Sequence, residues 1–273
     1  MLQVSALYIY PIKSLGGIAV DEALVTERGL QHDRRWMLVD NNNRFLSQRE
    51  IAQMALFKVA VTRGGLSVTY TPANSSLKIP FQPLHPQLFE VTVWDDICLV
   101  QRVSEEADTW FSNMLGIPCR LVYMPGDTRR QVDPNYASYG MITSFADAFP
   151  LMMISQASLD DLSARVGSPI PMNRFRPNMV YTGGKPYSED ELASFSINNI
   201  NFHGVKLCAR CPIPGIDQDT AISGKEPIKT LASYRRRQNK IYFGQNLVHE
   251  GTGILRVGDA LKILEVKNAV MFD

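Results

Sequence analysis

The chain has 273 residues, 45% of them hydrophobic and 20% charged, an ordinary composition for a globular protein with one large or two modest domains. Its 28 Lys and Arg residues nearly balance 27 Asp and Glu residues, so the formal net charge of +1 gives no overall attraction to a nucleic acid polymer or an anionic membrane. No apolar run approaches the ~18 residues of a membrane span, and the N-terminus lacks the basic and apolar segments of a signal peptide. We therefore expect a cytoplasmic protein that uses neither a membrane nor nucleic acid as a partner.

The first segment is a predicted strand over residues 2–10 that ends at Pro11. The loop that follows contains Lys13, Ser14 and two glycines. A cation, a hydroxyl and accessible backbone N–H groups are the components of an anion-binding loop. A plain turn is the commoner explanation of such a segment.

Short predicted strands separated by turns dominate the chain as far as residue 103. Arg34 and Arg35 precede one hairpin and alternate across a strand, so one of them should face inward, where a buried cation needs a partner. Many short strands of this kind are typical of a barrel or sandwich. The predicted strands cover residues 20–25, 36–39, 44–47, 58–62, 66–70, 77–81, 90–94 and 97–103.

Three helices are predicted, the first two of them amphipathic. Ser104 is a suitable N-cap for a helix that ends at Gly116, and a second helix spans roughly residues 158–166 before another glycine. A third, short helix opens at Pro227. The arginines that follow it, residues 235–237, are typical of a solvated helix end, and we assign them no function.

Arg174, Arg176 and Asn178 fall at alternate positions of a segment that we predict to be extended, so they should share one face. Two guanidiniums and an amide on one side form either a solvated edge or a binding surface. This window of sequence favours neither.

The predicted elements indicate a mainly β protein with a few helices. Strands continue to the C-terminal region, over residues 241–247 and 254–263, around tight turns. The polar stretch 124–133 marks a soft boundary. We therefore predict two joined β-barrel domains, residues 1–125 and 126–273.

Cys208, Arg210 and Cys211 lie within four residues, and Pro212 and Pro214 then oppose a helix and favour a stiff, extended loop. A thioredoxin-like redox pair needs a helix at this point, so the prolines disfavour that interpretation. A structural zinc site needs four ligands, and the remaining candidates lack a recognised spacing. Burial of small cysteines is the plain alternative. The remaining zinc candidates are Cys98, Cys119, His32, His85, His203 and His249.

Six separated stretches of the chain are informative together. They are residues 10–14, 33–36, 173–178, 208–211 with Asp217, 242–246 and 256–259. In that order they resemble the MOSC domain proteins that carry an N-terminal MOSC β-barrel, among them the mitochondrial amidoxime reducing component and its bacterial homologues. The resemblance covers nearly the whole chain, and six motifs in register are far more specific than any one of them.

The resemblance implies a MOSC β-barrel joined to an N-terminal MOSC β-barrel-like domain. It implies a protein with the molybdenum–molybdopterin cofactor that reduces N-hydroxylated compounds, including amidoximes and hydroxylaminopurine-type bases. Cys211 would ligate molybdenum, and Asp217 would be a proton relay or a loop cap. The segment before Arg34 would contribute to the catalytic barrel. The other implied cofactor residues are Lys13, Ser14, Arg34 and Arg176 at the phosphate, and Asp147, Asn178, Arg210 and Asn246 around the pterin.

The residue chemistry agrees with these implied roles. A soft thiolate suits a thiophilic metal that also binds the sulfurs of the pterin. Arg210 beside Cys211 would favour the thiolate, and planar guanidiniums meet a phosphate bidentately, which gives the inward arginines a partner. For Cys208 we expect a packing role.

The chain departs from the family pattern after the cysteine. Residues 214–218 replace a stretch in which family members carry two threonines, so substrate positioning near the metal is expected to differ. No cysteine follows Cys211, and an appended iron–sulfur module of the kind found in some bacterial relatives is therefore not expected. Electrons should then come from a separate ferredoxin- or flavoprotein-type reductase.

Two other functions fit the same resemblance. MOSC domains also occur in cofactor sulfuration, so the chain could be a cofactor carrier or sulfur-transfer module without reductase activity of its own. The altered segment after the cysteine and the missing electron-transfer module favour this alternative somewhat. The third hypothesis is that the site is degenerate and the chain is a structural relic without this function.

Overall fold

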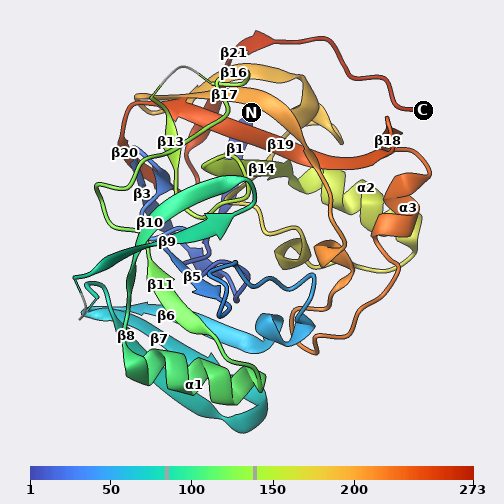
Figure 1. Ribbon diagram of the computed structural model, residues 1–273. Helices are drawn as coiled ribbons and strands as arrows, with labels where there is room; N and C mark the ends of the chain where they lie inside the picture. The colour runs from blue at the N-terminus through green and yellow to red at the C-terminus, as the bar shows by residue number, and fades with distance from the viewer. Residues whose placement is uncertain (84–85, 138–139) are drawn as a thin grey trace.

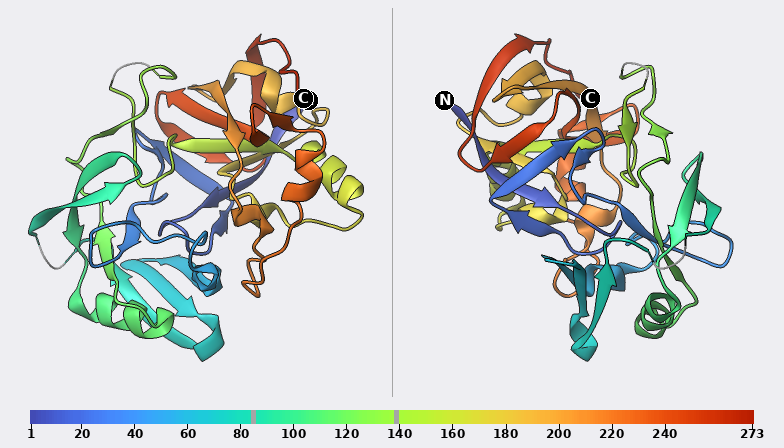
Figure 2. Two further views of the ribbon diagram at one scale, coloured as in Figure 1. Left: turned by 45° about the vertical axis from the view of Figure 1, so that its right-hand side comes forward. Right: turned by 90° about the vertical axis from the view of Figure 1, so that its left-hand side faces the viewer.

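The computed structural model describes residues 1–83, 86–137 and 140–273, and it confirms the mainly β prediction (Figure 1). Among the described residues there are three α-helices, α1 (Glu105–Leu115), α2 (Gln156–Val166) and α3 (Ile228–Ala232). No helix in this part of the chain is long and apolar enough to cross a membrane. The two views of Figure 2 show a two-part arrangement, with α1 at one end of the molecule and the chain's C-terminus at the other.

Seven strands close into a barrel. Alternate positions of each strand face its interior, which Leu7, Phe195, Phe202 and other apolar side chains fill. The strands run around the ring in the order β14 (Leu151–Ser155), β15 (Met179–Thr182), β1 (Leu2–Ile9), β21 (Ala260–Val266), β16 (Leu192–Ile197), β17 (Ile200–Ala209) and β19 (Lys240–Glu250). Antiparallel pairing of β14 with β19 completes the ring.

The N-terminal part is built on two smaller sheets. One contains β5 (Trp36–Val39), β11 (Arg120–Tyr123), β10 (Asp96–Arg102) and β9 (Leu88–Val93), and the other contains β6 (Phe57–Thr62), β7 (Gly65–Tyr70) and β8 (Ser75–Pro80). Bridges of Arg44 with Thr92 and of Phe45 with Val39 link the two edges of the first sheet into a small closed structure. The second sheet shares an apolar core with α1.

The strands among the first thirty residues belong to the seven-stranded barrel and its surroundings, whereas the loop after β1 contacts the N-terminal sheets through Ile12 and Leu15. β1 is a strand of the ring, and β2 (Ile18–Val20) pairs with it. β3 (Glu22–Thr26) pairs with β20 (Gly253–Arg256) and with β4 (Gly29–Leu30). This arrangement is the one implied for the segment before Arg34, while the boundary at residue 125 stays a prediction. The remaining strands are β12 (Arg130–Gln131), β13 (Ile142–Thr143) and β18 (Arg236–Arg237).

The helix ends follow the predicted capping residues. The Ser104 side chain accepts a hydrogen bond from the backbone N–H of Ala107 at 3.0 Å, and Gly116 ends α1 with a φ of 69°. Glycine also ends α2, which begins two residues earlier than predicted. The predicted strand over residues 20–25 is interrupted at Asp21, so it forms β2 and β3.

The prediction of an extended segment with Arg174, Arg176 and Asn178 on one face is wrong. A 3-10 turn, η3 (Met172–Arg174), stands there instead, closed by a 3.0 Å hydrogen bond from the N–H of Phe175 to the carbonyl of Met172. Arg176 then adopts a left-handed conformation with a φ of 56°. A turn, rather than strand alternation, therefore brings the three side chains to one place.

The arginine after α3 is not solvated as predicted. Arg235 is 4% exposed, and its guanidinium donates to the carboxylate of Asp190 at 2.5 Å. Asp190 and Glu189 form a buried acidic pair in the turn η4 (Ser188–Glu191). Arg235 and Asp190 are 45 residues apart in the chain, so no local pattern indicated this ion pair.

Glu189 should make the stability of the protein pH-dependent. Burial, and next the charge of Asp190, raise the pKa of Glu189 from 4.5 to about 7. Its contribution to the free energy of unfolding is therefore fully present below pH 4.5 and is lost as the pH rises through 7. The free energy of unfolding of Glu189→Gln, taken relative to that of wild type, should rise by up to about 3 kcal/mol between pH 4.5 and pH 7. Urea unfolding at several pH values measures this difference. The exposed neighbour provides the control Glu191→Gln, and parallel pH curves for wild type and Glu189→Gln would contradict the prediction.

Candidate functional site

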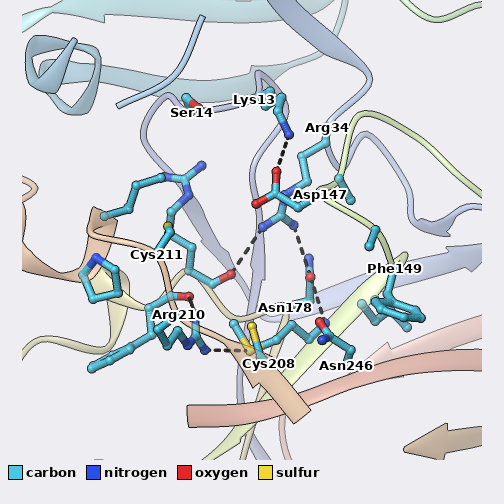
Figure 3. Close-up of a pocket in the computed structure, with 18 of the residues that line it drawn as sticks. Lys13, Ser14, Arg34, Asp147, Phe149, Asn178, Cys208, Arg210, Cys211 and Asn246 are labelled. Atoms are coloured by element: carbon cyan, nitrogen blue, oxygen red, sulfur yellow. Dashed lines mark hydrogen bonds and ion pairs between the residues drawn. The ribbon is translucent and has the colours of Figure 1, made fainter. Parts of the chain in front are cut away.

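A pocket lies where N-terminal loops meet the barrel, and it gathers nine of the ten predicted site residues (Figure 3). Six cationic side chains and one carboxylate line it, so its electrostatic potential is positive. In Figure 3, Lys13 and Asp147 lie toward one end, and Cys208 and Asn246 toward the other. The nine residues are Lys13, Ser14, Arg34, Asp147, Arg176, Asn178, Arg210, Cys211 and Asn246.

The Lys13 ammonium is held at one end of the pocket. It donates to the carbonyl of Phe145 at 2.8 Å and to the carboxylate of Asp147 at 2.6 Å. Burial lowers the pKa of Lys13 to about 8, although Asp147 acts in the opposite direction. Burial likewise opposes ionisation of Asp147, but Lys13 and Arg49 hold the pKa of that carboxyl well below its usual range. The Asp147 side chain is 58% exposed and remains an ionised partner of two cations at neutral pH.

Two guanidiniums lie over one buried tyrosine ring. The Arg34 and Arg176 guanidinium carbons are 4.4 and 4.3 Å from the ring centroid of Tyr10, whose hydroxyl donates to the carbonyl of Pro177 at 3.0 Å. Gly17 makes this position possible, because a Cβ there would lie 2.3 Å from a carbon of the ring. Contact with the Tyr10 ring therefore helps to position both guanidiniums in the pocket.

The two arginines differ in how their charge is balanced. Burial disfavours the charge of Arg34, but Asp33, at 2.6 Å, more than offsets it and raises the pKa of Arg34. Arg176 has no carboxylate partner among the described residues, and burial lowers its pKa to about 10. Its guanidinium donates to the carbonyl of Leu15 at 2.7 Å. Among the described residues, the pocket thus contains a half-buried cation that has no carboxylate counter-ion.

The glycine loop uses part of its backbone donors within the fold. The N–H of Lys13 donates to the carbonyl of Trp36, and that of Gly16 donates to the carbonyl of Phe57. These two N–H groups are therefore not available to bind an anion. Ser14, Arg34 and Arg176 all adopt left-handed backbone conformations, with φ of 67°, 49° and 56°. Such conformations are uncommon outside glycine and tend to gather at functional sites.

Arg210 braces the cysteine motif. β17 ends at Ala209, and the backbone N–H of Arg210 donates to the carbonyl of Ile241 at 2.7 Å. Its guanidinium donates to the carbonyls of Phe243 at 2.7 Å and Phe175 at 2.9 Å. Arg210 therefore ties the chain before Cys211 to two neighbouring segments, which sets the position of a half-buried thiol in the pocket wall.

Pro212 and Pro214 do not form the predicted extended loop. They form a short 3-10 turn, η5 (Ile213–Gly215), because the restricted φ of proline also suits helical turns, and Pro212 itself has a φ of −63° and a ψ of −15°. Cys208 lines the pocket and packs against the apolar cluster around Phe243. Burial raises the pKa of the Cys208 thiol.

Two carboxamides occupy the barrel side of the pocket. The Asn178 side-chain oxygen accepts from Arg34 at 3.1 Å and from the backbone N–H of Met152 at 3.3 Å, while its nitrogen donates to the carbonyl of Tyr8. Asn246 lies on β19 and lines the same wall. Asn178 uses its hydrogen-bonding groups mainly within the fold, so Asn246 is the carboxamide with donors and acceptors available to recognise a heterocycle.

Two sequence families match this chain. Residues 1–118 match the MOSC N-terminal beta barrel domain, and residues 142–262 match the MOSC domain. The mouse mitochondrial amidoxime-reducing component 1 is 30% identical over 279 residues, which covers 96% of this chain and 82% of the relative. The chain belongs to the MOSC family. The resemblance identified from the six motifs is therefore confirmed.

Further relatives of this MOSC protein differ in length. The molybdenum cofactor sulfurase of rice, Oryza sativa subsp. japonica, is 30% identical over 269 residues, which covers 91% of this chain and 33% of the relative. The chain thus spans about a third of that relative. The crystal structure of the YuaD protein from Bacillus subtilis is 14% identical and covers 96% of this chain and 94% of its own, with a TM-score of 0.44.

The tenth predicted residue of this MOSC protein, Asp217, lies outside the pocket lining. Its carboxylate accepts hydrogen bonds from the N–H of Asp219 at 3.1 Å and from the N–H and hydroxyl of Thr220, both at 2.9 Å. These bonds lower the pKa of Asp217. The geometry therefore agrees with a loop cap, one of the two roles considered, and does not bring the carboxylate to Cys211 as a catalytic group.

Two pocket residues of this MOSC protein were not assigned a role from the sequence. Arg49 donates to Asp147 at 3.2 Å, and Arg174 donates to the carbonyls of Gly215 and Ile216, which braces the loop after Cys211. The signal for Arg174 was its spacing from Arg176, whereas no motif included Arg49.

The described part of this MOSC protein contains no cluster of side chains that could form a zinc site. Within residues 1–83, 86–137 and 140–273, no group of three or more His, Cys, Asp or Glu side chains could hold a metal ion. His85, one of the candidate ligands, lies outside the described residues. All four cysteines are free thiols. A metal at Cys211 would therefore need its other ligands from outside the described residues.

Proposed function

We propose that this MOSC protein binds the molybdenum–molybdopterin cofactor and reduces N-hydroxylated compounds such as amidoximes and hydroxylaminopurine-type bases. The observation that carries the proposal is the convergence of a thiol, Cys211, with six cationic side chains in one pocket. Similarity to the mouse amidoxime-reducing component over 96% of the chain supports it.

The residues present fit such a cofactor. Its phosphate needs cationic donors, and Arg176 is a half-buried guanidinium without a carboxylate partner among the described residues. Its molybdenum accepts a soft thiolate, which Cys211 would provide. Its pterin needs hydrogen-bonding groups, and two carboxamides lie in the wall. Each part of the cofactor thus has a chemically matched residue in the pocket.

These chemical matches assign each pocket residue to one part of the cofactor. Lys13, Ser14, Arg34 and Arg176 would hold the phosphate, and Asp147, Asn178, Arg210 and Asn246 would surround the pterin. Arg210 and Arg174 orient the loop on which Cys211 lies, because their guanidiniums bind backbone carbonyls on both sides of it. When bound, the cofactor supplies the two-electron chemistry that removes oxygen from an N–OH group.

The overall reaction consumes two electrons and two protons for each N–OH group and yields the N–H product and water. A separate ferredoxin- or flavoprotein-type reductase would supply the electrons. Asp147 cannot supply the protons at neutral pH, because Lys13 and Arg49 keep it ionised. The Asp217 carboxylate accepts hydrogen bonds within its own loop. We therefore propose water at the mouth of the pocket as the proton source.

The alternative function is that of a cofactor carrier or sulfur-transfer module. The 30% identity to the rice molybdenum cofactor sulfurase favours it, and the substituted segment after Cys211 is consistent with a site not built for a substrate. Both functions use the same cofactor residues. They differ in whether an N–OH compound is turned over.

Turnover of benzamidoxime separates the two functions. Protein purified from a host that makes the cofactor is given dithionite-reduced methyl viologen, and benzamidine is measured by chromatography. We expect multiple turnovers per bound molybdenum. Full cofactor content without benzamidine formation would contradict reductase activity and favour the carrier function.

A further inference from the structure

A second pocket adjoins the first and shares Arg210 and Cys211 with it. It is more open than the cofactor pocket, and its remaining walls come from the turn after Cys211 and the start of α3. A molecule bound there would touch the same cysteine from another side. The remaining lining residues are Pro212, Gly224, Lys225, Ile228 and Lys229.

This second pocket combines an apolar surface with two exposed ammonium groups. Pro212 and Ile228 supply apolar area that suits a flat ring. Lys225 and Lys229 accompany them, and no described residue accepts a hydrogen bond from either ammonium. By contrast, the ammonium of Lys58 is paired with Asp219 at 2.6 Å.

The two lysines lie close together in the chain and line the same pocket. Lys225 precedes α3 and Lys229 lies in its first turn, and the backbone N–H of Lys229 donates to the carbonyl of Lys225 at 2.9 Å. Neighbouring like charges repel each other. Glu226, the acid between them, accepts from the N–H of Thr230 at 3.1 Å and forms no ion pair with either lysine.

We propose that the second pocket binds the anionic group of the substrate, so that this protein prefers N-hydroxylated compounds that carry a phosphate or carboxylate. This inference rests on the proposed reductase function. The apolar wall would hold the ring, the two ammonium groups would hold the oxyanion, and the N–OH group would face Cys211. A ligand in a lined pocket next to the thiol accounts for both the apolar and the charged residues, whereas an acidic protein surface would account for the charges alone.

The test compares N4-hydroxycytidine with its 5′-monophosphate, using holoenzyme and reduced methyl viologen so that no protein donor is involved. Wild type should show a kcat/KM at least tenfold higher for the monophosphate, and high salt should reduce this preference. The double variant Lys225→Gln/Lys229→Gln should lose most of the preference. The control Lys240→Gln/Lys262→Gln removes two exposed lysines elsewhere and should keep it.

Two further measurements, of ligand binding and of activity with a protein electron donor, test the inference where the first comparison cannot. If neither compound is reduced, the proposed function fails, but calorimetric binding of cytidine monophosphate against cytidine still tests the anion site in wild type and the double variant. Equal binding of these two ligands by wild type would overturn the inference. An effect of Lys225→Gln/Lys229→Gln that is seen only with a protein electron donor would also overturn it, and would assign the lysines to docking of that donor.

Discussion

Replacing Arg176 with Gln should lower the pterin and molybdenum content of the purified protein at least tenfold. The guanidinium is half-buried, desolvation lowers its pKa to about 10, and its single described hydrogen bond is to the carbonyl of Leu15. Partial burial of a cation without a carboxylate partner is unfavourable, and a phosphate in the pocket would offset this cost. The measurement is pterin fluorescence after acid oxidation, together with elemental mass spectrometry.

The thermal stability of the cofactor-free protein separates this role from a structural one. Arg176→Gln removes an uncompensated charge, so the midpoint of unfolding of the cofactor-free variant should equal or exceed that of cofactor-free wild type. Arg237→Gln, which changes an exposed arginine on β18, is the control and should retain full cofactor content. A normal pterin content in Arg176→Gln would contradict the phosphate assignment.

Replacing Cys211 with Ser should abolish benzamidoxime turnover, with a loss of at least a hundredfold in kcat. The side chain lines both pockets and is the half-buried thiol between them. Serine keeps the size but replaces a soft thiolate with a hydroxyl that binds molybdenum poorly. Because the phosphate and pterin contacts remain, the variant should retain most of its pterin while losing molybdenum.

Cys208→Ser is the matched control for metal content. Cys208 lies in the same motif and lines the same pocket, but it packs against apolar side chains and burial raises the pKa of its thiol. It should therefore keep its molybdenum. Full reductase activity in Cys211→Ser holoprotein would contradict the ligand role of Cys211.

Much of the fold follows from local sequence signals. The hairpin of β6 and β7, with its Arg63-Gly64 turn, and the capped helix that begins after Ser104 match the predicted segments closely. The closure of the seven-stranded ring does not follow from such signals, because β1 pairs with strands more than 170 residues later. The family resemblance, rather than periodicity, indicated that the first segment belongs to the later barrel.

The candidate site was also only partly predictable from the sequence. The family resemblance predicted nine residues that line one pocket, eight of them within the six motifs and the ninth at Asp147, although their role in binding a cofactor remains a prediction. Arg49 could not be identified, since only the fold brings it to Asp147 across 98 residues. The family resemblance implied that Asp217 is either a proton relay or a loop cap, but its carboxylate does not line the pocket and accepts hydrogen bonds from its own loop. No local pattern distinguished these two roles, because the direction of the side chain depends on the turn that follows Cys211.

The most direct test of the account is the cofactor content of the wild-type protein, purified from a host that makes the molybdenum cofactor. Molybdenum is measured by elemental mass spectrometry, and the pterin is measured by fluorescence in the same sample. We predict close to one molybdenum and one pterin for each chain. Protein that contains neither, under conditions in which a known molybdenum enzyme from the same host is fully loaded, would contradict the assignment of this pocket.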